Sequence, residues 1–306
     1  MNKLFALVCC LLMLGIAWGC APQRGAQAMA LDTPDRVALG DAFLATAWCQ
    51  TPAAKGGKGV SFRWRGRAYS VPLMPTQASG YGGVAYMLLP VPVDHQGLAP
   101  MELEVRCPDA KNSVARHTLA LYAKDRPVQE LTVAKRYVHP PKSVQERIAE
   151  DRRKVRAATG VFSPQPLWHL PLARPVQGSV SSQFGLKRVF NGEPRSVHKG
   201  LDLRGPEGTP VHALADGLVV LVDNLYFSGN VVYIDHGVGV VSASLHLSKA
   251  LVRKGQRVRR GETIGLVGAT GRVTGPHLHL SLIVQGVSVD PLPLLEPRQD
   301  ATGGKR

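Results

Sequence analysis

Gly275-Pro-His-Leu-His-Leu280 contains the most informative pair of histidines in this 306-residue chain. The apolar run that continues it, Leu282-Ile-Val284, indicates a strand. Because side chains alternate between the two faces of a strand, His277 and His279 are predicted to point the same way, about 7 Å apart along the backbone. Two imidazoles on one face suit a metal site, or one metal ligand beside one acid or base.

A second pair of chemistry-bearing residues lies upstream, in Val197-His-Lys-Gly-Leu-Asp-Leu203. His198 and Asp202 are four residues apart, which puts both side chains on one face whether the segment is a strand or a helix. Gly200 between them and Gly205-Pro206 just beyond favour strand and loop. With the downstream histidines, the pair offers neutral and anionic ligands, enough for a catalytic zinc that keeps one coordination position open.

Three further histidines lie in the same region, and each one alone is better explained as a structural histidine. They are His212, His236 and His246. His246 stands at the end of an apolar segment, Ser244-Leu-His-Leu-Ser248. The indication of a site comes from a set of residues gathered in one small region, mostly near predicted strand ends, where sites are commonly built. The set is His198, Asp202, His246, His277 and His279.

Residues from about 31 to 126 are predicted to form an immunoglobulin-like β-sandwich. Short alternating segments recur there at the spacing of sandwich strands, separated by turns rich in glycine, proline and aspartate. Only Cys49 and Cys107 lie outside the N-terminal leader, and their flanks indicate strands. A disulfide between two sheets, typical of an oxidising compartment, is the favoured interpretation, and two free thiols are the alternative.

A change of composition between about 127 and 177 predicts a linker that contains one helix. Ser143-Val-Gln-Glu146 has the capping-box pattern, which predicts a helix from about 143 to 158 with Ser143 as its N-cap. The helix would carry a narrow apolar stripe made of Val144, Ile148 and Val155. We therefore expect it to lie on one of the domains. A solvated face explains its many arginines better than nucleic acid does.

Residues 178–296 are predicted to form a second β-domain, denser in strands than the first. Only short gaps separate its strand-like segments, so helices have little room. The segments include Val211–Ala215, Gly217–Val222, Asn230–Ile234, Val238–Leu245 and Thr263–Val267. Residues 297–306 are predicted to be a disordered tail, and the chain as a whole is expected to be mainly β.

The N-terminus, residues 1–30, has the pattern of a signal peptide. Its apolar run, Leu4–Trp18, follows a charged start and is short for a transmembrane helix. Ala28-Met-Ala30 offers an A-x-A cleavage site, which would start the mature chain near Leu31. Lipidation at Cys20 is the less favoured alternative, because the residues before it fit the lipidation pattern poorly. We expect an exported protein of the periplasm or cell envelope.

The formal net charge of +15 favours anionic partners. For an exported protein these are the cell wall and the anionic surface of the cell envelope, although a solvated basic surface explains the charge nearly as well. The sequence has no recognition-helix pattern, no zinc-finger spacing and no aromatic-and-basic RNA-binding motif. We therefore expect no nucleic-acid partner.

Several motifs agree, in order and spacing together, with a known family. They are His198-x-x-x-Asp202, His246-Leu-Ser248, Gly271-x-x-x-Gly275-Pro-His-x-His279 and the glycine pattern of Val258–Gly271. Through them, roughly residues 175–295 resemble the lysostaphin-type zinc endopeptidases of cell walls. The resemblance does not cover the N-terminal half, although such peptidases often carry an added β-domain. One departure is Ser244, where family members usually have an aromatic residue.

The resemblance implies an antiparallel β peptidase domain with a substrate groove. His198, Asp202 and His279 would be the ligands of one Zn²⁺ per chain. His246 and His277 would be the catalytic pair, which accepts the proton of the attacking water and stabilises the oxyanion. The expected function is that of an exported zinc-dependent endopeptidase that hydrolyses the peptide cross-links of peptidoglycan, with its peptide stems as substrate.

The alternative is a non-catalytic wall-binding protein or amidase activator on the same scaffold, which zinc content would distinguish from the enzyme. The complete set of five residues favours the enzyme. Serine hydrolysis is disfavoured because no G-x-S-x-G motif is present. The bond that is cut, in a glycine bridge or in a D-Ala-to-diamino-acid cross-link, stays open. So does the part played by the N-terminal domain, the linker or a regulatory protein partner in covering the groove.

Overall fold

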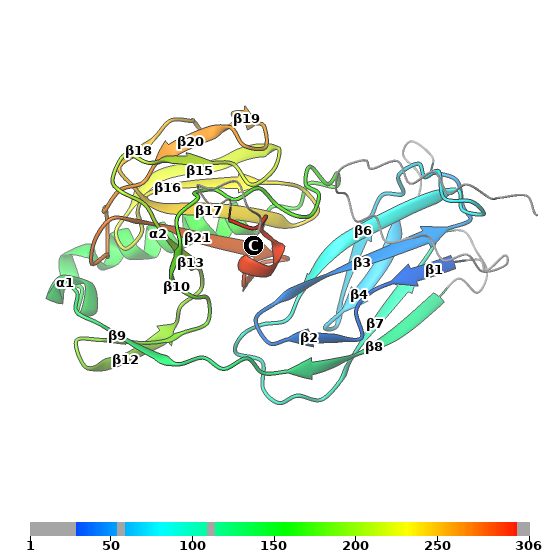
Figure 1. The fold of residues 1–306 in the computed structure, drawn as a ribbon, viewed down its shortest axis with the longest axis horizontal. Coiled ribbons are helices and arrows are strands. Elements are labelled where there is room, and N and C mark those ends of the chain that lie inside the picture. Colours follow the sequence, from blue (N-terminus) through cyan, green and yellow to red (C-terminus); the bar gives the residue numbers. More distant parts are fainter. Residues whose placement is uncertain (1–28, 54–58, 109–113, 299–306) are drawn as a thin grey trace, which may run out of the picture.

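The computed structural model describes residues 29–53, 59–108 and 114–298. It is mainly β, as predicted, and its strands form two bodies that lie side by side in Figure 1. The N-terminal strands make one body, and the C-terminal strands make the other, with both α-helices on the same side as the C-terminal strands. The predicted signal peptide and tail lie outside the described residues, apart from Met29, Ala30, Pro297 and Arg298.

The N-terminal body is a pair of sheets that share one core. The first has the order β1 (Met29–Asp32), β3 (Ala42–Cys49), β6 (Gly83–Pro90). The second has the order β2 (Arg36–Ala38), β8 (Val114–Tyr122), β7 (Met101–Arg106), β4 (Val60–Trp64), β5 (Arg67–Val71). Alternate residues of both sheets, such as Met87 of β6 and Phe62 of β4, are fully buried in that core. The two sheets therefore form a β-sandwich, and its immunoglobulin-like character stays a prediction.

Strand β1 bears on where a leader could be removed. Met29 and Ala30 are its first two residues and pair with Cys49 and Trp48 of β3. Cleavage after Ala30 would remove half of β1, including the buried Ala30 side chain. A neighbouring A-x-A triplet, Ala26-Gln-Ala28, would leave the strand whole.

The predicted disulfide between Cys49 and Cys107 is confirmed, with 5.8 Å between the two Cα atoms. Cys49 ends β3 of the first sheet, and Cys107 directly follows β7 of the second, so the bridge ties the two sheets together.

We expect the double substitution Cys49→Ser, Cys107→Ser to lower the free energy of unfolding of this body by about 2–5 kcal/mol, because the bridge closes a loop of 58 residues. Urea unfolding followed by tryptophan fluorescence measures the change, since Trp48 and Trp64 are buried in these sheets. An unchanged midpoint for the double variant would show that the bridge adds no stability.

The linker adds a strand and two helices to the C-terminal body. They are β9 (Val128–Leu131), α1 (Lys135–Val138) and α2 (Gln145–Thr159), with a 3₁₀ turn over Lys142–Val144. The capping box was wrong: Ser143 lies inside the 3₁₀ turn, Val144 is the N-cap of α2, and no side chain caps the helix. The helix was also predicted to lie on one of the domains, and it does: α2 buries Ile148 and Ala158 and packs on β15.

The C-terminal body is built on an eight-stranded antiparallel sheet. Its order is β10 (Val180–Ser182), β13 (Leu201–Arg204), β21 (His277–Val284), β17 (Val240–Leu247), β16 (Gly229–Asp235), β15 (Gly217–Leu225), β19 (Arg257–Val258), with β22 (Val287–Val289) paired to β21. A three-stranded sheet has the order β14 (Pro210–His212), β20 (Thr263–Leu266), β18 (Lys249–Ala250), and a third has the order β12 (Glu193–Val197), β11 (Lys187–Phe190), β9. Strand β14 is shorter than predicted: it ends at His212, and residues 213–215 are not part of it.

The two faces of the eight-stranded sheet carry different side chains. Alternate residues such as Leu278 and Leu280 of β21 enter the main core. The opposite residues, such as Tyr233 and Ile283, form a second cluster with Ala158 of α2. The polar residues of the candidate site lie on this second face.

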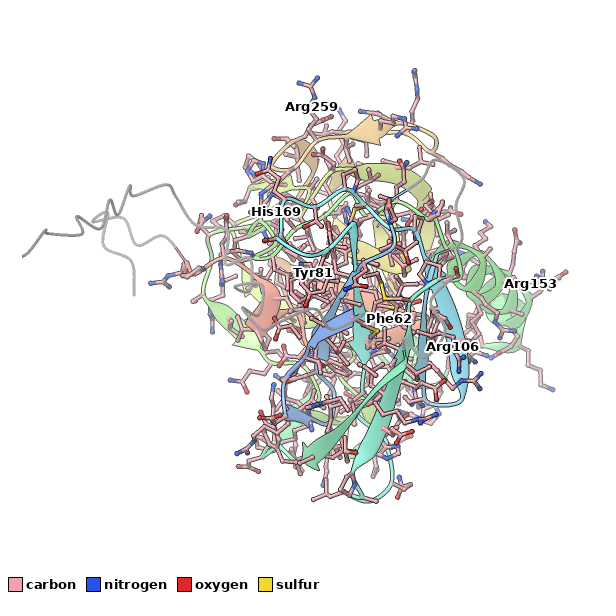
Figure 2. All side chains as sticks on the ribbon, turned by 90° about the vertical axis from the view of Figure 1, so that its right-hand side faces the viewer. Phe62, Tyr81, Arg106, Arg153, His169 and Arg259 are labelled. Carbon is pink, nitrogen blue, oxygen red and sulfur yellow. A yellow bond between two sulfur atoms is a disulfide. The ribbon has the colours of Figure 1, made fainter. Side chains whose placement is uncertain are left out.

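The two bodies are in direct contact. Lys124 forms ion pairs with Asp41 of the N-terminal body and Asp290 of the C-terminal body. The rings of Tyr86 and Trp168 pack edge to face, with centroids 5.4 Å apart. Figure 2 shows that Arg153 of α2 and Arg259 point away from the ribbon, as expected of solvated basic side chains. Within the described part of the chain, no helix has the length and apolar character to cross a bilayer.

Candidate active site

Strand pairing places Asp202, His277 and His279 on one face of the sheet. Asp202 on β13 lies directly opposite His279 on β21, and Arg204 lies opposite His277. Partners that face each other across an antiparallel pair project from the same side of the sheet. His198 precedes β13, and its backbone N–H donates to the carbonyl oxygen of Leu186, which holds the loop beside Asp202.

Three ligand-type atoms converge at this point. His279 Nδ1 lies 2.8 Å from Asp202 Oδ1 and 3.0 Å from His198 Nε2. His198 Nε2 lies 3.1 Å from Asp202 Oδ1. His198 and Asp202 are buried and His279 is half-buried, so little water reaches these atoms.

The outer hydrogen bonds of the two histidines decide which nitrogen carries the hydrogen. His198 Nδ1 lies 2.8 Å from the carbonyl oxygen of Gln183, which can only accept. The Ser281 hydroxyl donates to the carbonyl oxygen of Lys199, so it accepts from His279 Nε2 at 3.0 Å. Both histidines therefore turn a nitrogen lone pair toward the Asp202 carboxylate. Three acceptors in contact repel one another unless a cation lies between them, so this donor set fits a metal ion.

A hydrogen-bond network holds Asp202 in place. Arg188 Nη2 donates to Asp202 Oδ2 at 2.8 Å, which leaves Oδ1 for the convergent point. Gln129 Oε1 accepts from the Ser182 hydroxyl at 2.9 Å and from Arg188 Nε at 3.3 Å. Gln129 belongs to β9, so the linker supports the arginine that orients the carboxylate.

Gly200 is required by the close approach of the backbone to His279. A Cβ atom at this position would lie 2.2 Å from His279 Nε2, well inside contact distance. This explains the glycine in the His-Lys-Gly-Leu-Asp stretch.

His246 reaches the site through an irregularity in β17. Leu245 pairs with His279 and shares its face, so regular alternation would send the next side chain to the main core. Instead, the register between β16 and β17 shifts between Ser244 and Leu247, and His246 has a left-handed φ of 64°. The extra residue turns His246 to the site face and returns Leu247 to the main core. A non-glycine residue in this conformation costs about 1–3 kcal/mol and is typical of functional positions.

His246 and His277 present matching nitrogens to the site. Their Nδ1 atoms each lie 2.8 Å from a backbone carbonyl oxygen, of Thr270 and of Gly275 respectively. Since a carbonyl can only accept, Nδ1 carries the hydrogen and each Nε2 keeps a lone pair free. The two ring centroids are 5.2 Å apart. The arrangement gives two imidazoles that can accept a proton or, once protonated, donate a hydrogen bond.

Burial favours the neutral form of two of the site histidines, His246 and His279. Burial, with His279 and His277 adding to its effect, lowers the pKa of His246 to about 3. Burial also lowers the pKa of His279, although Asp202 opposes that shift. Neutral imidazole is the form that binds metal and the form that accepts a proton, so both residues are ready for these roles at neutral pH.

Two adjoining cavities on this face form one groove, which we call the site groove. The linker supplies part of its walls: Val155 and Thr159 come from α2, and Gln129, Leu131 and Val133 come from β9 and the residues just after it. None of the described residues of the N-terminal sandwich lines it. Ser244, the departure from the family pattern, is buried on the core face and does not line it either.

All five candidate residues line the site groove. Several residues that support them were not predicted from the sequence. Ser281 and Gln129 were not predicted, and neither were Arg272, Phe190 and Phe227 of the groove wall. Gln129 lies 73 residues before Asp202, so no local pattern could have linked them. Ser281 follows His279 at strand spacing, and that alternation is the signal that could have found it. His212 and His236 lie outside the groove, as structural histidines.

Comparisons with known proteins identify a family for the C-terminal body. Residues 196–291 match the model of the family described as Peptidase family M23. The chain is 50% identical over 112 residues to the peptidoglycan DD-endopeptidase ShyA of Vibrio cholerae, covering 36% of this chain and 26% of that protein. It is 38% identical over 149 residues to the DD-carboxypeptidase/endopeptidase Mpg of Neisseria meningitidis, covering 49% of this chain and 33% of that protein.

A solved structure is similar over more of the chain. A peptidase M23 from Pseudomonas aeruginosa is 30% identical, with a TM-score of 0.59, over 83% of this chain and 92% of that one. The chain thus spans nearly all of this neighbour, but only about a quarter to a third of the two curated relatives.

Proposed function

Because this chain belongs to peptidase family M23, we propose that it is an exported zinc-dependent endopeptidase that hydrolyses peptide cross-links of peptidoglycan. The observation that carries the proposal is the convergence of His198 Nε2, Asp202 Oδ1 and His279 Nδ1, three acceptors that need a cation between them. The names of ShyA and Mpg, both endopeptidases, support the substrate class. The disulfide supports export to an oxidising compartment.

Two imidazoles and one carboxylate are the ligand types of catalytic zinc sites, which leave a further position open. When bound, zinc would lower the pKa of a coordinated water towards about 7 and polarise the scissile carbonyl. The protein's own part is to hold these three ligands: Arg188 fixes Asp202, the Gln183 carbonyl fixes His198, and Ser281 fixes His279.

His246 and His277 perform the proton chemistry in this proposal. Their free Nε2 atoms face the groove, and His277 Nε2 lies 3.8 Å from Asp202 Oδ1, beside the ligand cluster. One imidazole accepts the proton of the attacking water, and the other, when protonated, donates a hydrogen bond to the developing oxyanion. The carbonyls of Thr270 and Gly275 keep both rings oriented for these steps.

The proposal is tested by peptide release from isolated peptidoglycan, with and without a chelator. We expect purified protein to release peptides, the chelator to stop release, and added Zn²⁺ to restore it. Bound zinc with no release from any peptidoglycan would overturn the enzymatic proposal and favour the wall-binding or amidase-activator alternative. Release that the chelator leaves unchanged would overturn the metal-dependent mechanism.

A further inference from the structure

Arg272 occupies an unusual position in the wall of the site groove. Its guanidinium carbon lies 4.7 Å from the ring centroid of Phe190 and 4.8 Å from that of Phe227, so the cation is held between two aromatic rings. Its backbone N–H donates to the carbonyl oxygen of Phe227 at 2.8 Å, which fixes the start of the side chain. Phe190 is itself buried against Val133 and Val138 of the linker. The guanidinium is therefore positioned in advance of any ligand.

The Arg272 guanidinium has no acidic partner. Arg188 pairs with Asp202, and Arg195 pairs with Glu193. Arg272 forms no ion pair and no side-chain hydrogen bond with any residue of the described ranges, and its nitrogens are not closed off from the groove. Burial, with Arg188 and Arg195 nearby, lowers its pKa to about 10, so it remains charged at neutral pH.

The charge of the whole groove points the same way. Its described lining has five cationic residues and one carboxylate, Asp202, which already faces the ligand cluster and Arg188. The cationic residues are Arg188, Arg195, Lys199, Arg204 and Arg272. Arg272 and His246 both line the two cavities, so the unpaired cation and a residue of the predicted catalytic pair share the same groove. A groove of this kind suits an anionic peptide.

We infer that Arg272 binds a free carboxylate of the substrate peptide close to the bond that is cut. This inference rests on the proposed function and makes it more specific. A D-Ala-to-diamino-acid cross-link whose diamino acid has a second carboxyl group keeps that carboxylate beside the scissile amide, whereas a glycine bridge has none within the bridge. The planar guanidinium can bind a carboxylate through two parallel hydrogen bonds while its central carbon stays over the rings of Phe190 and Phe227. Arg272 thus selects the diamino-acid cross-link.

The test uses two synthetic cross-linked peptides that differ only in that carboxylate, which is free in one and amidated in the other. We expect the wild-type protein to prefer the free carboxylate by about tenfold to a hundredfold in kcat/KM. Arg272→Gln is expected to cut both peptides at the low rate of the amidated one. Arg272→Lys is expected to keep part of the preference, since it retains the charge but not the planar group.

Arg195→Gln is the matched control, because it removes the same charge from the same groove at a residue that already has a partner. It is expected to keep the preference for the free carboxylate. Metal analysis of every variant checks that the ligand cluster is intact. Equal cleavage of the two peptides by the wild type, or an undiminished preference in Arg272→Gln, would overturn the inference and leave the proposed function standing. Failure of the wild type to cut either peptide or isolated peptidoglycan would instead overturn the proposed function.

Discussion

His279→Ala is expected to lose the bound metal and to reduce peptide release by at least about a thousandfold, because metal activation contributes several kcal/mol to such hydrolysis. His279 is at the centre of the cluster: its Nδ1 contacts both Asp202 Oδ1 and His198 Nε2. Removing it leaves two ligands, too few for a tightly held zinc. Metal analysis of the purified variant, together with peptide release, measures both effects.

The matched control is His212→Ala, which removes a histidine of the same region that does not line the groove. It is expected to retain both metal and peptide release. A His279→Ala protein that kept a full equivalent of zinc would contradict the ligand assignment, whatever its activity.

His246→Ala and His277→Ala are expected to keep the metal and still lose turnover. Neither residue is needed to complete the ligand set, but each offers a free Nε2 to the groove. Loss of a proton acceptor or of an oxyanion donor costs about 10²–10⁴-fold in kcat. Steady-state cleavage of a cross-linked peptide, combined with metal analysis, separates this pattern from that of His279→Ala.

The His246→Ala variant also tests the β-bulge in β17, the extra residue that turns His246 to the groove. If His246→Ala retained wild-type activity, the left-handed backbone at this position would have no catalytic purpose, and its assignment to the pair would be wrong. Loss of zinc from either variant would place that histidine among the metal ligands instead.

Much of the ligand cluster could be predicted because it depends on regular strand geometry. His277 and His279 alternate with core leucines in the printed sequence, and that alternation is what the structure keeps. The register that sets Asp202 opposite His279 follows from the same pattern, since Leu201 and Leu203 must face the core. One buried face fixes the register of a strand and with it the neighbouring polar residues.

The rest of the site depends on contacts that local patterns do not encode. Alternation alone would place His246 on the core face, and only the bulge turns it to the groove. Gln129 reaches Arg188 because β9 pairs in parallel with β11, a contact between distant segments. At the start of α2, the 3₁₀ turn displaced the predicted cap by one residue, because local hydrogen bonding competes at helix ends.

The linker also bears on access to the groove. Helix α2 and strand β9 line the groove, and ion pairs and hydrogen bonds such as Lys154–Asp223 and Arg147–Asn224 fasten α2 to β15. None of the described sandwich residues lines the groove, and its described walls come from the linker and the C-terminal body.

The most direct test of the metal centre is anomalous X-ray diffraction from crystals of the purified protein, recorded on both sides of the zinc absorption edge. We predict one peak per chain, at about 2.0–2.2 Å from His198 Nε2, Asp202 Oδ1 and His279 Nδ1. A peak bound by other residues, or no peak in crystals grown with zinc present, would contradict the assignment of these three residues as the metal ligands.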